Sequence, residues 1–394
     1  MKLLYSLLAL FVLWGCQSGN GSQASDENAS DEASASNPEL VSGTDVFLDS
    51  LQLPEGFSIE IFGRVDNARS MAMSPNGTLF VGNRGEGGVY AVRDINGDYK
   101  IDERYQIAKD LTMPNGVAFK DGDLYVAEVS KLWKYSNIEE NLSNPPAPEL
   151  IYEDYPTDKH HGWKYIAFGP DGKLYVPVGA PCNICESENE IYASITRMDA
   201  NGANREVFVS GVRNTVGFTW HPETGDLWFT DNGRDMLGDD IPPCELNRAS
   251  AQGQHFGYPY CHGGTIKDPE FGDKFPCENF VKPAQNLDAH VAPLGVKFYT
   301  GSMFPESYKN IIFVAEHGSW NRSPEAGHSG HRVTMVREEN GQGVAYEPFI
   351  TGFLNKSTNQ AWGRPVDILV LEDGSMLLSD DLSGTIYRIT YKES

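Results

Sequence analysis

The stretch DKHHGWKYIAFGPDGKLYV, residues 158–176, shows the pattern from which the fold is predicted. A polar start leads into an apolar segment at 165–168, the tetrapeptide GPDG follows at 169–172, and the chain continues as LYV at 174–176. Glycine, proline and aspartate favour tight turns, whereas tyrosine, valine, isoleucine and phenylalanine favour strands. The stretch therefore predicts two short strands joined by a hairpin turn.

The same strand–turn–strand phrase recurs along the chain. Five further copies lie at 69–81, 115–126, 213–229, 291–314 and 364–378, and the copy at 291–314 is the loosest. The turn glycines Gly77, Gly122, Gly172 and Gly225 follow one another at intervals of about 50 residues. Hairpins at this spacing, without helical periodicity between them, are typical of the four-stranded blades of a β-propeller. Six copies predict an all-β, six-bladed β-propeller over residues 51–394, closed by pairing of 57–62 with 385–391.

The composition limits the classes of partner. The 394 residues carry a formal net charge of −24. A chain this acidic repels phosphate backbones, so we expect no nucleic-acid partner. The 40 glycines and 23 prolines agree with short strands joined by turns.

The first 16 residues, MKLLYSLLALFVLWGC, have the features of an export signal. Lys2 precedes an apolar run that is too short for a stable membrane span, and the run ends at Cys16 in a sequence that resembles the lipobox of bacterial lipoproteins. We expect lipidation of Cys16; an ordinary secretory signal is the alternative. Residues 17–50 hold seven acidic residues and no lysine or arginine, which predicts a disordered tether. The protein is thus expected to be an exported lipoprotein that faces the periplasm or the cell surface and is membrane-anchored by lipid alone.

The repeat also predicts a site. The first strand of each propeller blade lines the central channel, so the residues that enter these strands meet at one mouth. Here these residues are polar in every copy: Arg69, Asn115, His161, Arg213 with Asn214, His290 and Arg364. Because buried charge requires partners, a packed core of such residues is unfavourable, and a polar pocket is expected at the channel mouth.

Five phrases resemble the soluble bacterial sugar dehydrogenases that use pyrroloquinoline quinone (PQQ), especially the sorbosone and pyranose dehydrogenase branch. They are KHHGWKYIAFGPDGKLYVPVGAPCN at 159–183, GVRNTVGFTWHPETGDLWFTDNGRD at 211–235, HVAPLGVKFYTG at 290–301, VAEHGSWNRS at 314–323 and GRPVDILVLEDG at 363–374. The resemblance implies a six-bladed propeller, in agreement with the repeat count. It also implies PQQ over the channel mouth, with a calcium ion beside its quinone oxygens.

The resemblance implies a catalytic base. His161 matches the family's histidine that accepts a proton from the substrate hydroxyl while hydride passes from the adjacent carbon to the quinone. An imidazole suits this role because its unperturbed pKa of ~6.5 leaves it mostly neutral near pH 7. We expect His160, together with Arg69 and Asn115 of the polar mouth, to contact the substrate.

The resemblance also implies cofactor contacts. PQQ carries three carboxylates, which suit arginine's planar fork. Arg213 and Asn214 match a cofactor-contacting pair, and Arg364 matches another arginine. The soluble glucose dehydrogenases have a lysine where this chain reads EHGSWNR at 316–322, so Arg322, or else His317, is expected to replace it. A surface position is the alternative for Arg322.

Two segments are candidate calcium sites. The family binds calcium through backbone carbonyls that match Gly233 and Arg234, and carbonyl oxygens are suitable ligands for this cation. A second segment, DINGDYKID at 94–102, imitates the start of an EF-hand, but Tyr99 replaces its glycine and Tyr105 its closing glutamate. This segment is expected to be a weak calcium site or a polar turn.

Five cysteines follow Cys16. Cys182 and Cys185 form a CxxC without a following histidine, so covalent haem is not indicated. In an exported protein we expect a local disulfide there, with thiol redox catalysis as the alternative. Cys261 and Cys277 could join an insertion between blades four and five, which leaves Cys244 unpaired. A zinc site built from four of the cysteines is a further alternative.

These patterns and the resemblance predict a PQQ- and calcium-dependent oxidoreductase that oxidises the CH–OH group of a sugar. The sequence shows no haem or second cofactor motif, so a separate cytochrome or a quinone is expected to accept the electrons. One alternative is a calcium-dependent lactonase-type hydrolase, but such sites need several carboxylates, whereas this mouth has arginine, asparagine and histidine. A non-catalytic propeller binding protein is the third possibility.

Overall fold

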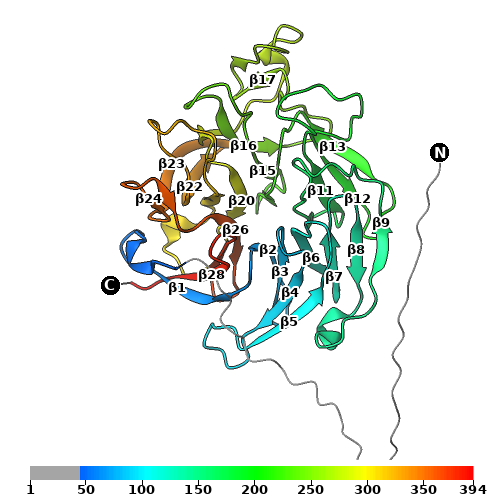
Figure 1. Ribbon diagram of the computed structural model, residues 1–394, viewed down its shortest axis with the longest axis vertical. Helices are drawn as coiled ribbons and strands as arrows, with labels where there is room; N and C mark the ends of the chain where they lie inside the picture. The colour runs from blue at the N-terminus through cyan, green and yellow to red at the C-terminus, as the bar shows by residue number, and fades with distance from the viewer. Residues whose placement is uncertain (1–44, 394) are drawn as a thin grey trace, which may run out of the picture. The chain divides into compact units, whose positions relative to one another are not determined.

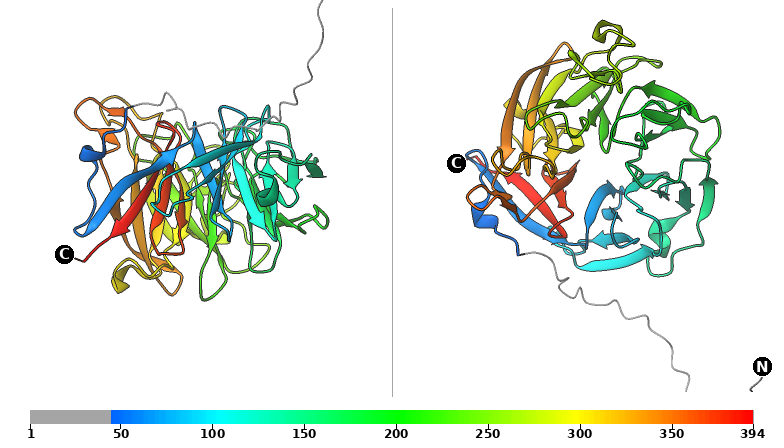
Figure 2. Two further views of the ribbon diagram at one scale, coloured as in Figure 1. Left: turned by 90° about the horizontal axis from the view of Figure 1, so that it is seen from below. Right: turned by 45° about the horizontal axis from the view of Figure 1, so that its top comes forward.

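The computed structural model describes residues 45–393. Within this range the strands form six four-stranded antiparallel sheets arranged as blades around a central channel (Figures 1 and 2). The predicted all-β, six-bladed propeller is therefore confirmed. Residues 1–44 lie outside the described residues, and with them the predicted export signal, Cys16 and most of the predicted tether.

Each of the first three blades is built from four consecutive strands, ordered from the channel to the rim. Blade 1 contains β2 (Ala68–Met73), β3 (Thr78–Asn83), β4 (Val89–Arg93) and β5 (Glu103–Ala108). Blade 2 contains β6 (Gly116–Lys120), β7 (Asp123–Ala127), β8 (Leu132–Tyr135) and β9 (Glu149–Tyr152). Blade 3 contains β10 (Ala167–Phe168), β11 (Leu174–Val178), β12 (Ser194–Met198) and β13 (Glu206–Ser210).

The later blades carry insertions. Blade 4 contains β14 (Phe218–Trp220), β15 (Leu227–Asp231), β16 (Pro243–Ala249) and β19 (Gln285–Ala289), with the hairpin β17 (Cys261–His262) and β18 (Ile266–Lys267) before its last strand. Blade 5 contains β20 (Pro293–Phe298), β21 (Ile312–Glu316), β22 (Arg332–Glu339) and β23 (Gln342–Ile350). The hairpin β24 (Leu354–Asn355) and β25 (Gln360–Ala361) leads into blade 6, which contains β26 (Pro365–Val370), β27 (Met376–Asp380) and β28 (Thr385–Tyr391).

The strand β1 (Phe57–Arg64) completes blade 6 and closes the ring. It pairs antiparallel with β28, from Phe57 opposite Tyr391 to Arg64 opposite Thr385. This is the closure predicted from the sequence. The Phe57 ring lies 4.7–5.0 Å, between centroids, from four other aromatic rings: those of Phe304, Tyr308, Phe349 and Tyr391.

Glycines in the inner strands allow neighbouring blades to approach. A Cβ atom added to Gly217 would lie 2.1 Å from the Leu294 carbonyl oxygen of the next blade, and one added to Gly295 would lie 2.6 Å from the Val366 carbonyl oxygen. Such distances are impossible for a side chain against fixed backbone. Gly217 and Gly295 therefore allow blades 4, 5 and 6 to pack closely around the channel.

Regular structure begins a few residues before residue 51, the predicted start of the propeller. Residues Leu48–Ser50 form the 3-10 turn η1, Phe47 packs edge-on against Trp362 at 5.8 Å between centroids, and Gln52 forms a bridge with Thr351. The prediction of a tether up to residue 50 is therefore corrected, because these apolar side chains find partners on blades 5 and 6.

The three other helical segments are the 3-10 turns η2 (Ile138–Asn141), η3 (Cys277–Asn279) and η4 (Glu306–Tyr308). Within residues 45–393, no helix has the length and apolar character needed to cross a membrane.

Candidate active site

A cavity of about 330 Å³ opens where the inner strands begin. Four arginines, three histidines and two tryptophans contribute to its wall. The full lining is Arg69, Arg84, His161, Trp163, Arg213, Asn214, Asn232, Gly233, Asp235, Cys244, His290, Ala292, Leu294, His317, Gly318, Trp320, Asn321 and Arg364. Beneath it, Val216, Leu294 and Val366 form an apolar cluster with Trp163.

The structure brings most of the sequence-predicted site residues to this cavity. Of the strand-entry residues, all but Asn115 line it, and so do His317 and Gly233. Asn115 is fully buried instead: its Nδ2 donates to the Lys164 carbonyl at 2.8 Å, and its Oδ1 accepts from the Arg69 Nε at 2.5 Å. The predicted substrate contact of Asn115 is therefore corrected to a support for Arg69.

Three further predicted residues, His160, Arg322 and Arg234, lie outside the cavity lining. His160 is exposed, and its ring lies against that of His161 at 3.9 Å between centroids. Arg322 donates to the carbonyls of Gly327 at 2.7 Å and Asp239 at 2.5 Å, and it pairs with Asp240 at 3.1 Å. These contacts join two loops of the rim, so the structure favours His317 over Arg322 as the replacement for the family's lysine.

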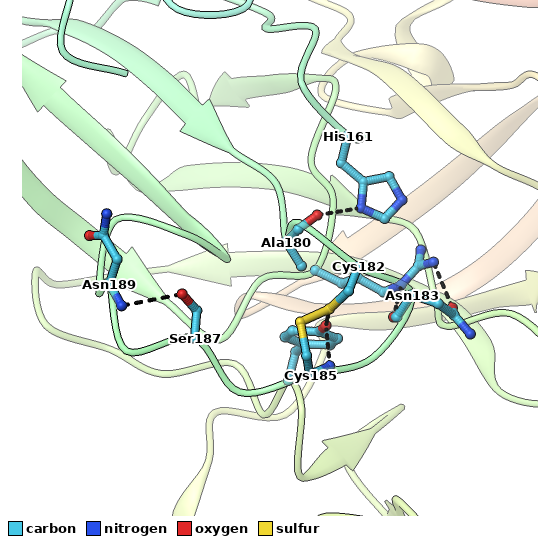
Figure 3. The surroundings of a disulfide bond; sticks show 9 residues. His161, Ala180, Cys182, Asn183, Cys185, Ser187 and Asn189 are labelled. Carbon is cyan, nitrogen blue, oxygen red and sulfur yellow. Dashed lines mark hydrogen bonds between the residues drawn. A yellow bond between two sulfur atoms is a disulfide. The ribbon is translucent and has the colours of Figure 1, made fainter. Parts of the chain in front are cut away.

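His161 is held in the orientation of a proton acceptor. Its ring is buried, and its Nδ1 lies 2.9 Å from the Ala180 carbonyl oxygen (Figure 3). Because a carbonyl can only accept, Nδ1 carries the proton and Nε2 keeps its lone pair. Burial, together with the charge of Arg213, lowers the pKa of His161 to about 2, so its ring is neutral. Gly179 makes room for it, since a Cβ there would lie 2.5 Å from the Cβ of His161.

Two of the four arginines in the wall have no ion-pair partner among the described residues. Arg69 pairs with Asp381, and Arg213 pairs with Asp235 at 2.9 Å. The Arg84 guanidinium lies over the Trp163 ring at 4.2 Å, and Arg364 donates to the carbonyls of His317 and Gly318. Burial and the nearby charge of Arg69 lower the pKa values of both Arg84 and Arg364. The wall therefore has excess positive charge, which favours an anionic ligand.

His317 has an acidic partner. Its Nε2 lies 2.8 Å from a carboxylate oxygen of Asp381, the same side chain that pairs with Arg69. Burial lowers the pKa of His317 to about 4, and Asp381 opposes this effect. Asp381, fixed between these two groups, orients both at the cavity wall.

The residues predicted to bind calcium have free carbonyl groups. The carbonyl oxygens of Gly233 and Arg234 accept no hydrogen bond from the part of the chain that the structure describes. The Arg234 side chain turns to Asp268, with which it forms a buried ion pair. Among residues 45–393, no three histidine, cysteine, aspartate or glutamate side chains lie together as metal ligands.

The second candidate calcium segment is a turn held by its own side chains. Asp94 accepts from the backbone amides of Gly97 at 2.8 Å and Tyr99 at 2.7 Å. Asp102 likewise accepts from the Ile95 amide at 2.8 Å. These acceptors are used within the turn, which agrees with the polar-turn alternative.

The structure contains both disulfides considered in the sequence. Cys182 and Cys185 are bonded, and so are Cys261 and Cys277 in the insertion of blade 4. The four cysteines are thus not available for a zinc site. Cys244 is free and buried, and it lines the cavity.

Sequence reasoning missed Arg84, Trp163 and Asp381. Arg84 follows the second strand of its blade, as Gly233 and His317 do in theirs. The loops after these second strands reach the same channel mouth as the strand entries. The repeat therefore indicated one such loop in every blade, but site residues were predicted only in the loops of blades 4 and 5. Trp163 also fits a ligand site: it lines the cavity, and its indole Nε1 is buried without a partner.

Comparisons with known proteins identify relatives of this chain. A family model described as TrAA12-like matches residues 51–392. An uncharacterized protein of Borreliella burgdorferi is 34% identical over 362 residues, which cover 87% of this chain and 92% of that protein. The pyrroloquinoline quinone-dependent pyranose dehydrogenase of Coprinopsis cinerea is 23% identical over 414 residues, which cover 86% of this chain but only 54% of that protein.

A solved structure shows the same fold. The calcium structure of Trichoderma reesei Carbohydrate-Active Enzymes Family AA12 has a TM-score of 0.76 and 19% sequence identity. The alignment covers 90% of this chain and 99% of that one.

Proposed function

Because the chain belongs to the TrAA12-like family, as the sequence resemblance indicated, we propose that it is a PQQ-dependent dehydrogenase that oxidises the CH–OH group of a sugar. The observation that carries the proposal is the juxtaposition of a neutral, oriented His161 with Arg84 and Arg364, neither of which forms an ion pair within the described residues. An anionic redox cofactor and a proton acceptor are the two components that such an oxidation requires.

The cavity residues fit the cofactor. Arg84 and Arg364 would hold PQQ carboxylates, since guanidinium groups bind carboxylates with two parallel hydrogen bonds. Arg213, which donates to Asn183, Asn232 and Asp235, would contact the cofactor with its remaining N–H group. The orphaned Trp163 Nε1 offers one further donor at the wall. When bound, PQQ supplies the acceptor for the two electrons that leave the substrate carbon as hydride.

The protein residues supply orientation and proton transfer. Nε2 of His161 is the free acceptor for the substrate hydroxyl proton, and the Ala180 carbonyl stabilises the charge that the ring then acquires. The Gly233 and Arg234 carbonyls would hold calcium, whose charge would polarise the reacting oxygens. The exposed indole of Trp320 at the opening offers a flat apolar face for a sugar ring.

The proposed function also implies a substrate and an electron acceptor, and the predicted lipid anchor implies a location. The substrate is a sugar of the aldose, pyranose or sorbosone type, and a separate cytochrome or quinone takes the electrons. Lipidation of Cys16 would hold the enzyme at a membrane outside the cytoplasm. Metabolic labelling with a palmitate analogue tests this anchor: it should label the wild-type protein and leave Cys16→Ser unlabelled.

Reconstitution tests the function. The protein without residues 1–16 is mixed with PQQ and calcium, and reduction of an artificial electron acceptor is followed across a panel of aldoses and related sugars. We expect sugar-dependent reduction that requires both additions and is abolished in His161→Ala. His328→Ala is the matched control, because its Nδ1 bonds to the Ser319 hydroxyl and its ring does not line the cavity. If PQQ does not bind, the dehydrogenase proposal fails, and lactone hydrolysis becomes the assay.

A further inference from the structure

The loop of residues 180–185 between β11 and β12, here called the disulfide loop, lies directly behind the cavity wall. The disulfide between Cys182 and Cys185 closes it into a short ring (Figure 3). Outside this ring, the Cys185 amide donates to the Tyr258 hydroxyl at 3.1 Å. The loop contains no regular secondary structure, so its shape depends on the disulfide and on such side-chain contacts.

The disulfide loop contacts both a base and an arginine of the cavity. At its start, the Ala180 carbonyl accepts from His161, and the Ala180 amide donates to the Arg213 carbonyl at 2.8 Å. Between the two cysteines, the carbonyl of Asn183 accepts from the Arg213 Nε at 2.9 Å, and its Oδ1 accepts from the Arg213 Nη2 at 2.9 Å. One short segment therefore orients two functional groups that come from different blades.

Asn183 also holds the acidic partner of that arginine. Its Oδ1 accepts from the Asp235 amide at 2.8 Å, and its Nδ2 donates to the Asp235 carbonyl at 3.0 Å. The Asp235 carboxylate accepts from Arg213 and from the Nδ2 of Asn321 at 2.6 Å. Asn183 thus joins the disulfide loop to the loop after β15, and through Asp235 to the loop after β21.

We propose that Asn183 and the Cys182–Cys185 disulfide form a positioning element for the active site. They hold the Arg213 guanidinium and the His161 imidazole in the geometry that cofactor and substrate require. The disulfide restricts the four-residue ring to the shape in which the Asn183 backbone and side chain face Arg213 together. The inference rests on the proposed function where it takes Arg213 as a cofactor contact.

The first test needs no ligand. Backbone amide exchange at Asp235 reports the hydrogen bond to Asn183. We expect faster exchange in Asn183→Ala and in the double variant Cys182→Ser/Cys185→Ser. Asn183→Asp keeps an acceptor at the Oδ1 position and should restore slow exchange. Two controls should leave exchange at Asp235 unchanged: Asn189→Ala, whose side-chain oxygen accepts from the neighbouring Ile191 amide, and Cys261→Ser/Cys277→Ser in the other disulfide.

The second test measures binding and turnover. PQQ affinity is followed by quenching of tryptophan fluorescence, because Trp163 and Trp320 line the cavity. We expect the Kd for PQQ to rise about tenfold or more in Asn183→Ala and in Cys182→Ser/Cys185→Ser. The kcat/KM of the loaded enzyme should fall by on the order of 10²-fold, as misplacement of a catalytic group does. The thermal midpoint should stay close to wild type in Asn183→Ala, which separates positioning from general unfolding.

The outcomes distinguish this inference from the proposed function. If wild type binds PQQ and Asn183→Ala binds it equally well, the positioning role is overturned and the dehydrogenase proposal stands. If wild type does not bind PQQ, the proposed function fails, and exchange at Asp235 still decides whether Asn183 and the disulfide order the wall. Unchanged exchange in both variants overturns the inference in either case.

Discussion

His161 shows how one buried side chain is prepared for proton transfer. Its Nδ1 is committed to the Ala180 carbonyl, which leaves Nε2 as the only acceptor of the ring. Burial and the nearby charge of Arg213 lower the pKa of the ring, so the ring is neutral and has a low affinity for protons in the cofactor-free protein. An anionic cofactor would raise that affinity, so the base would become stronger when the cofactor is bound.

The first prediction concerns the charge state of His161. In the cofactor-free protein its pKa is lowered to about 2, so the ring should show no protonation between pH 5 and pH 8. Nuclear magnetic resonance titration of the ring protons measures this, with His161→Gln used to identify the signal. A midpoint near the ordinary value of 6.5 would show that the ring is more accessible to water than the structure indicates.

The second prediction concerns the unpaired arginines. Arg84→Gln and Arg364→Gln each remove a charged donor that forms no ion pair within residues 45–393, so PQQ binding should weaken by about 1.5–3 kcal/mol, or roughly 10- to 150-fold. Titration calorimetry measures the loss. Arg337→Gln is the matched control, because that side chain is exposed and makes only long contacts with the Ser307 carbonyl. Wild-type affinity in both cavity variants would contradict the proposed carboxylate contacts.

At the residue scale, the sequence predicted residue types at the mouth better than side-chain directions. The position of His161 at a strand entry was readable because the repeat aligns such entries. Asn115 occupies an equivalent position, yet it points into the packing between blades and supports Arg69. Arg322 turns away because the Asp239 carbonyl and Asp240 attract its guanidinium. Those contacts come from another loop, and their geometry is not encoded in the spacing of either segment.

At the scale of elements, the hairpin pattern was sufficient to identify the blades. Turn glycines and short β-rich segments are local signals, and they placed the first two strands of every blade. Outside blade 6, the third and fourth strands, such as β22 and β23, have no recurring turn motif and were not predicted individually. The hairpins β17–β18 and β24–β25 were missed because they are only two residues per strand and lie inside insertions.

The third prediction tests the close approach of inner strands. In Gly217→Ala the added methyl group would lie 2.1 Å from the Leu294 carbonyl oxygen, so blades 4 and 5 must separate. We expect a loss of several kcal/mol in the free energy of unfolding, as overpacking produces ~1–3 kcal/mol even where side chains can adjust. Urea denaturation measures it.

Gly85→Ala is the control for this prediction. A Cβ at Gly85 would meet nothing nearer than the Asn67 Oδ1 at 3.4 Å. Its free energy of unfolding should stay within about 0.5 kcal/mol of wild type. Equal stability of Gly217→Ala and Gly85→Ala would show that the blades tolerate a wider channel.

At the scale of the whole molecule, closure of the ring depends on the pairing of β1 with β28. The strand β1 completes a blade whose other three strands come from the opposite end of the described chain. The sequence predicted this closure because both segments have strand character and their pairing leaves the ring without a free edge. The excess positive charge of the cavity, within a chain of net charge −24, was predictable only in part, since it required knowing which arginines lack acidic partners.

The fourth prediction tests the closure. Phe57→Ala removes a ring that contacts four aromatic side chains, so it should lower the free energy of unfolding by ~2–4 kcal/mol. Phe47→Ala is the matched control, because that ring is 52% exposed and contacts only Trp362 among aromatic rings of the described residues. Guanidinium denaturation followed by tryptophan fluorescence measures both. A similar, small loss in each variant would show that backbone pairing alone closes the ring.

The pairing of β1 with β28 also sets an order of events during biosynthesis. The ribosome makes β1 before any blade and β28 after all of them, yet the two strands are neighbours in the finished sheet. Until β28 is available, β1 has an unpaired edge and blade 6 is incomplete. Closure of so long a loop is slow, and an open edge invites pairing with other chains. The chain therefore cannot reach its native state before β28 is free to pair with β1, and until then the edge of β1 is open to other chains.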